Sequence, residues 1–144
     1  MAVKPIPEGY SPVTPYLIVR DADAVLTFVK SAFGADVKEE HRMPDGTVMH
    51  AVFAIAGAPV MMGQANDRWP ERPAMLHVYV PDADATYTRA LKAGGKSIQD
   101  MTTQFYGDRS GGVEDPSGVV WWIATHVEDV APEEIERRAK AQRG

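Results

Sequence analysis

Four histidines and one glutamate are the side chains of this sequence best suited to proton transfer or metal binding. The 144-residue chain has no cysteine, which excludes disulfides, thiolate nucleophiles and cysteine-based zinc sites. Its histidines are His41, His50, His77 and His126. An imidazole changes charge near neutral pH and can also bind a transition metal. Glu114 would be a candidate general base if its side chain faced a cavity.

The patterns around these residues give them different expected roles. His77 lies in "MLHVYV", a short run that alternates as a strand does, so it is either a functional cavity residue or a half-buried histidine bonded to backbone. His50 follows a hairpin, and its facing is open between structural, solvated and functional. His41, in "EEHR", is expected to be solvated. His126 ends a strand, where capping at the surface is expected.

The stretch "FYGDRSGG" combines charged and hydroxyl side chains with three glycines. Such a loop could fold over a cavity and hold an anion through Arg109. The alternatives are an internal contact between Asp108 and Arg109, or a surface pair between Arg109 and Glu114. No order of serine, histidine and aspartate indicates a triad, and no phosphate-binding motif is present.

The strands and helices that must position these residues are expected to occur twice along the chain. Residues 14–63 and 75–124, aligned without a gap at an offset of 61, share eleven identical positions of fifty. Unrelated segments of average composition would share about three. The clearest match pairs "VRDADA" from Val19 with "VPDADA" from Val80. We interpret this as a duplicated supersecondary unit.

The sequence pattern of each unit predicts a strand, a helix and then three further strands. An aspartate before each expected helix can accept hydrogen bonds from its first turn, and a glycine follows each helix as a stop. The predicted modules span 12–64 and 74–125, within one domain of 1–144, and a helix is expected over 132–142. Further strands are expected at 37–43, 47–55, 59–63, 97–103, 109–114 and 119–125.

Composition limits the classes of function. The net charge of −5 and pI of about 5.3 argue against nucleic-acid binding. No apolar stretch is long enough to cross a bilayer, and the N-terminus has no signal-peptide pattern. A cytoplasmic protein is therefore expected.

The duplicated unit, with "VRDADA…AFGA", "PDG", "LHVYVPDADA", "FYGDRSGG", "EDPSG" and "THVEDV", resembles the vicinal oxygen chelate superfamily, which includes glyoxalase I, bleomycin-resistance proteins and extradiol dioxygenases. The resemblance is greatest to its PhnB-like branch and covers residue 12 to about residue 135. It implies an α+β fold in which two tandem βαβββ modules form a curled mixed sheet around a central cavity. It also implies a homodimer.

The resemblance also marks four positions where relatives such as glyoxalase I hold a metal. In this chain they are Thr14, Met61, Met75 and Trp122, related in pairs by the same offset of 61. Divalent zinc, nickel or iron needs imidazole, carboxylate or thiolate ligands, which these residues do not offer. No metal and no cofactor are therefore expected at this position.

Strand alternation places further side chains on the same face as these four positions. The ligand-binding set expected from it, together with the Arg109 loop, is Tyr16, Met61, Met75, His77, Tyr79, Trp122 and Arg109. Aromatic rings and thioethers suit a flat or apolar compound.

Two functions follow. The first is metal-independent binding of an apolar or aromatic small molecule by sequestration, as in bleomycin resistance. The alternative is a glyoxalase-class lyase, isomerase or dioxygenase that uses zinc, nickel or iron held by His50, His77 and Glu114.

Overall fold

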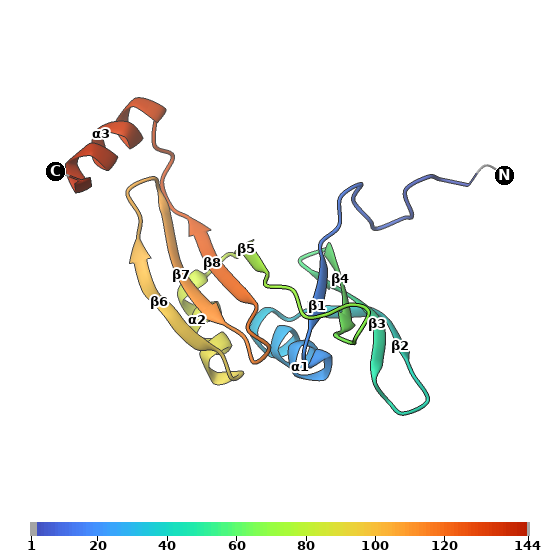
Figure 1. Ribbon diagram of the computed structural model, residues 1–144. Coiled ribbons are helices and arrows are strands. Elements are labelled where there is room, and N and C mark those ends of the chain that lie inside the picture. Colours follow the sequence, from blue (N-terminus) through green and yellow to red (C-terminus); the bar gives the residue numbers. More distant parts are fainter. Residues whose placement is uncertain (1–2, 144) are drawn as a thin grey trace.

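The βαβββ unit occurs twice along the chain. The computed structural model describes residues 3–143, so residues 1, 2 and 144 of the expected domain lie outside it. The first unit consists of β1 Tyr16–Val19, α1 Ala22–Phe33, β2 Asp36–Arg42, β3 Val48–Ile55 and β4 Ala58–Gln64. The second consists of β5 Met75–Tyr79, α2 Ala83–Lys92, β6 Lys96–Thr103, β7 Asp108–Glu114 and β8 Val120–His126, and α3 Pro132–Arg143 follows. The α+β class is confirmed (Figure 1).

Each unit forms its own four-stranded mixed sheet. The strand order is β1-β4-β3-β2 in the first sheet, here sheet A, and β5-β8-β7-β6 in the second, sheet B. In both sheets the first strand runs parallel to the last strand of its unit, and the other pairs are antiparallel. The two sheets therefore share one topology.

Both helices begin in the same way. Asp21 accepts a hydrogen bond from the backbone N–H of Ala24, and Asp82 accepts one from Ala85, each at 3.1 Å. These bonds satisfy N–H groups that a helix leaves free in its first turn. The first aspartate of each "DAD" phrase is thus explained by the need of each crossover helix for its own N-cap.

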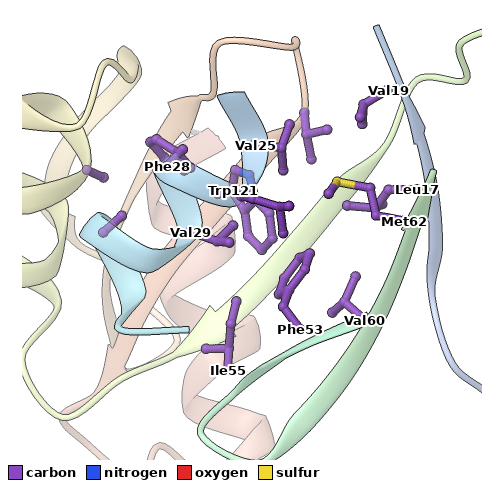
Figure 2. Close-up of a cluster of buried hydrophobic side chains, with 14 of the residues drawn as sticks. Leu17, Val19, Val25, Phe28, Val29, Phe53, Ile55, Val60, Met62 and Trp121 are labelled. Atoms are coloured by element: carbon purple, nitrogen blue, oxygen red, sulfur yellow. The ribbon is translucent and has the colours of Figure 1, made fainter. Parts of the chain in front are cut away.

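One core lies between the two sheets. α1 and α2 pack against each other, and each also covers one face of its own sheet. Trp121 of β8 is 1% exposed, and its ring centroid lies 5.0 Å from that of Phe33 in α1. Figure 2 shows Trp121 among Phe28, Phe53 and other apolar side chains of α1 and sheet A. The two units therefore fold around a shared apolar centre.

The turn before β8 fixes Trp121 and joins the units. Asp115 is buried and accepts hydrogen bonds from the indole Nε1 of Trp121 at 2.9 Å and from two backbone N–H groups of its own turn. Burial raises the pKa of Asp115, although these donors oppose the shift. Ser117 in the same turn exchanges hydrogen bonds with the backbone of Asp21, at the start of α1.

In a single chain the sheets do not close around a central cavity. Because the inner faces of both sheets turn toward the shared helical core, their outer faces point away from it (Figure 1). The curled sheet expected from the resemblance is therefore present as two separate open sheets. Among residues 3–143 no helix has the length and apolar character required to cross a membrane.

Candidate functional site

The outer face of sheet B carries large side chains that solvent reaches. Met75 and Tyr79 are 65% and 60% exposed, His77 between them is also exposed, and Trp122 on the neighbouring strand is half-buried. Trp122 lies opposite His77 in the register of β5 and β8. Along β5 and β8, the residues that alternate with these four face the core, as strand alternation requires. Apolar surface of this kind at neighbouring positions is typical of a binding surface.

A hollow of about 360 Å³ opens on this face. We call it the sheet-B hollow, and its lining residues are His77, Gln99, Gln104, Tyr106, Ser110 and Trp122. Tryptophan and tyrosine supply aromatic surface, while the amides and the hydroxyl can donate or accept hydrogen bonds. The lining therefore combines stacking surface with uncharged polar groups, which suits an uncharged planar molecule.

A polar network adjoins the sheet-B hollow. The hydroxyl of Tyr79 donates to Asp108 at 2.8 Å, and Nδ1 of His126 lies 2.8 Å from the other oxygen of the same carboxylate. Nε2 of His126 lies 2.8 Å from Asp129. The ring of Tyr79 is 4.7 Å from that of His77, measured between centroids. Asp108, which is buried, thus holds the tyrosine that contacts His77.

The network shifts the pKa values of Tyr79, Asp108 and His126. Hydrogen bonds to Asp108 and Asp129 raise the pKa of His126, and the bond to Asp108 raises the pKa of Tyr79. Burial acts to raise the pKa of Asp108, but the bonds from His126 and Tyr79 outweigh it, so this pKa lies below its usual value. These shifts favour an ionised Asp108, a neutral Tyr79 and a protonated His126.

We expect His126 to titrate above the ordinary histidine value of 6.5. A pKa that is higher in the folded than in the unfolded protein stabilises the fold below pH 6.5, and this contribution disappears as the pH rises through the folded-state pKa. NMR titration of the imidazole C–H signals, assigned with His126→Ala, measures it. Asp108→Asn should lower the value. A pKa at or below 6.5 would show that the two carboxylates do not hold the ring.

The outer face of sheet A carries a second group of side chains. Tyr16 is 49% exposed, and its hydroxyl shares a hydrogen bond of 3.0 Å with Nδ1 of His50. The ring of His41 is stacked on that of His50, with centroids 6.1 Å apart. Gly63 lies beside Tyr16, but it is the neighbouring strand that leaves no room for a side chain, because a Cβ at residue 63 would lie only 2.9 Å from the backbone oxygen of Met49.

A hollow of about 530 Å³ lies on this side, and we call it the sheet-A hollow. Its lining comes from sheet A and from the segment that precedes β1: Pro7, Tyr10, Ser11, Pro12, Thr14, Glu39, His50 and Met61. The N-terminal segment therefore forms one wall over the outer face of sheet A.

A third hollow, of about 390 Å³, lies where the two units meet. It is mainly apolar, with Val13 and Pro15 before β1, Ile55 and Val60 of sheet A, and Leu76 and Val78 of β5 among its lining residues. His77 and Tyr79 border it as well. β5 thus separates this hollow from the sheet-B hollow, and His77 contributes to both.

A single chain places the expected ligand-binding residues on two surfaces. Met75, His77, Tyr79 and Trp122 lie on the outer face of sheet B, while Met61 lines the sheet-A hollow and Tyr16 lies on the same sheet. Arg109 lies away from both groups, because its guanidinium binds Asp84 of α2 at 2.8 and 3.0 Å.

The residues considered for a metal-dependent enzyme are also separated. His50 lines the sheet-A hollow, His77 lies on β5, and Glu114 ends β7 near the turn at Gly118. Across residues 3–143, no three histidine, aspartate or glutamate side chains gather in a way that could hold a metal ion.

The hydrogen-bond network at Asp108 was not predicted from the sequence. Asp108 pairs with Tyr79 and His126 rather than with Arg109. Residues 108–112 belong to β7, in agreement with the strand expected at 109–114, and do not form a loop over a cavity. One signal was available: strand parity from Trp122 continues through Ala124 to His126, which places this histidine on the face of Tyr79. At the offset of 61, the first unit has Ile18, Thr47 and Ala65 where the second unit has Tyr79, Asp108 and His126.

Comparisons with known proteins agree with this architecture. Residues 11–123 match the model of the Glyoxalase/Bleomycin resistance protein/Dioxygenase superfamily. The chain is 33% identical to the uncharacterised protein Mb0911c of Mycobacterium bovis over 144 residues, which covers 90% of this chain and 93% of that protein. It is equally identical to Rv0887c of Mycobacterium tuberculosis, of which it covers 83%.

Two solved structures show the same fold. The crystal structure of TioX from Micromonospora sp. ML1 superposes with a TM-score of 0.70 at 23% identity, covering 81% of this chain and 99% of TioX. The PhnB protein of Bacillus cereus superposes with a TM-score of 0.64 at 21% identity, covering 80% and 99%. The chain belongs to the glyoxalase, bleomycin-resistance and dioxygenase superfamily.

Proposed function

We propose that this protein binds a planar, apolar or aromatic small molecule and sequesters it without a resident metal ion. The observation that carries the proposal is the outer face of sheet B, where Met75, His77 and Tyr79 are exposed beside Trp122. Exposing large apolar side chains at neighbouring positions of a sheet forgoes their burial free energy, about 1.5–3 kcal/mol for each one. Binding of a ligand would recover part of it.

The chemistry of the four inherited positions supports binding without a metal. The resemblance implies that Thr14, Met61, Met75 and Trp122 occupy the positions of ligands in metal-using relatives, and none of the four offers an imidazole, carboxylate or thiolate. A thioether is soft and uncharged, and an indole nitrogen has no free lone pair. The same side chains are well suited to dispersion and stacking contacts.

A homodimer is part of the proposal. The two outer faces point away from each other within one chain, so one ligand can be covered by both only if a second copy supplies the other face. The edge of β5 that does not pair with β8 is also open to a partner strand, and exposed edges of sheets favour association. We infer that sheet A of one copy covers sheet B of its partner.

Light scattering at tens of micromolar, a concentration chosen for ordinary dimers, should therefore give about twice the chain mass of 15.7 kDa. Met75→Lys, which places a charge at the exposed start of β5, should shift the protein toward monomer. Met49→Lys is the matched control, because Met49 is 56% exposed but shares the strand parity of Ala51 and Phe53, which face the core, so it does not lie on the outer face of sheet A. A monomeric unaltered protein, or equal effects of both substitutions, would count against this dimer.

Binding itself is testable with acridine, a neutral three-ring heteroaromatic compound. Acridine should quench the fluorescence of Trp122, and His77→Ala should weaken binding about 2–10-fold, the range of a single aromatic contact. His41→Ala is the control, because His41 is an exposed imidazole that lies outside the sheet-B hollow. Acridine that does not bind, or that binds equally to both variants, would contradict the proposed site.

A further inference from the structure

We propose that Gly112 sets the depth of the sheet-B hollow and thereby the size of planar ligand that it accepts. The inference rests on the proposed function, because it concerns the ligand of the same hollow. Gly112 lies on β7, directly opposite Trp122 of β8. Trp122 is flanked on its other side by His77, so these three positions form one row across the sheet.

The missing side chain of Gly112 is what allows the indole of Trp122 to lie low on the sheet. A Cβ at this position would be 2.8 Å from Cζ3 and 3.0 Å from Cε3 of Trp122, and 2.8 Å from Ile98. Distances below 3.0 Å are sterically forbidden, so one neighbour would have to move. The six-membered ring of the indole therefore occupies the space that a side chain of residue 112 would fill.

The backbone gives no other reason for glycine here. The glycines of residues 3–143 with positive φ are at turns and at helix ends, and Gly112 is not among them. In sheet A the residue opposite Met61 is Val52, which makes a pair of two medium-sized side chains. The corresponding pair in sheet B joins a glycine, Gly112, to a tryptophan, Trp122. The glycine at position 112 is thus explained by the indole of Trp122, which lies over it.

A methyl group at residue 112 would meet both Ile98 and the indole, and because two atoms of the indole ring lie within 3.0 Å of it, we expect the ring to move outward. Trp122 lines the sheet-B hollow, and an outward shift of its ring would make this hollow shallower. A larger planar molecule needs the full stacking area and depth, whereas a small one can shift sideways. Gly112→Ala should therefore discriminate between ligands by ring number, which general damage to the fold would not do.

Gly111 offers a matched control one residue away. Its Cβ would also be crowded, at 2.7 Å from the sulfur of Met101 and 3.1 Å from the ring of Tyr87 in α2, but on the opposite face of β7. Gly111→Ala should thus destabilise the fold to a similar degree without touching Trp122.

The experiment uses the full chain labelled with 5-fluorotryptophan, which gives one ¹⁹F signal for each of its three tryptophans. Gly112→Ala should shift the Trp122 signal, assigned with Trp122→Phe, and Gly111→Ala should leave it in place. Affinity for acridine should fall about tenfold in Gly112→Ala, while affinity for two-ring quinoline changes less than about twofold. An unshifted Trp122 signal, or equal losses for both compounds, would overturn the inference.

Should Gly112→Ala fail to fold, combining it with Trp122→Leu and, separately, with Ile98→Ala decides the matter, because each second substitution removes one of the two side chains that clash. Recovery of the fold with Trp122→Leu supports the inference, and recovery only with Ile98→Ala, or with neither, overturns it. The fluorine signal needs no ligand, so it separates the two proposals. Unaltered protein that binds neither compound would refute the proposed function, while the Trp122 signal would still report whether Gly112 supports the ring.

Discussion

Replacing Trp121 by alanine should lower the free energy of unfolding by about 3–5 kcal/mol, the usual cost of removing a large buried aromatic side chain. Trp121 is 1% exposed, contacts Phe33 of α1 and donates its indole N–H to the buried Asp115. The substitution would open a cavity in the shared core and remove one of the donors to a buried carboxylate. Both units should therefore lose stability together.

Chemical denaturation of the full-length variants measures this change, with Trp122→Ala as the control. The two tryptophans are neighbours in sequence but lie on opposite faces of β8, so Trp122→Ala should cost only about 1–2 kcal/mol. Equal destabilisation by the two substitutions would contradict the assignment of one face to the core and the other to the ligand.

Trp122→Ala should instead have the largest effect on ligand binding. Stacking of a planar molecule on an aromatic side chain contributes about 1–3 kcal/mol, so affinity for acridine should fall about 5–150-fold. Trp121→Phe keeps an aromatic core and should leave the affinity within about twofold. A stable Trp122→Ala variant that binds acridine as well as the unaltered protein would remove this side chain from the site.

Much of the fold could be predicted because the two units carry local sequence patterns, namely helix caps and strand alternation. Asp21 and Asp82 cap their helices, and Gly34 ends the first helix in a left-handed conformation with φ of 64°. Strand alternation separated Trp121 from Trp122, since adjacent residues of a strand point to opposite faces. These relations depend on neighbours in sequence, which a single sequence contains.

The arrangement of the two units could not be predicted in the same way. Whether the sheets curl toward each other or open depends on how α1 and α2 pack, and the residues that decide it, such as Phe33 and Trp121, are far apart in sequence. For the same reason the partner of Arg109 was missed. Its ion pair with Asp84 joins a strand to a helix across 25 residues.

The hydrogen-bond network at Asp108 was missed for a different reason. "FYGDRSGG" has the composition of a flexible loop, and the strand expected at 109–114 leaves Asp108 outside it. In the structure Asp108 begins that strand, and the residues that follow it are largely buried. The glycines there are needed because neighbouring side chains lie against them, as Trp122 does against Gly112. Crowding of this kind is a tertiary property, and glycine content alone does not distinguish it from flexibility.

The most direct test of metal-independent binding is titration of acridine into purified protein, followed by Trp122 fluorescence, with and without EDTA and with metal analysis of the same sample. We predict that quenching and affinity are the same in both titrations, because no cation joins ligand and protein. One zinc, nickel or iron per chain, together with loss of acridine binding in EDTA, would contradict the account and make His50, His77 and Glu114 the residues to replace.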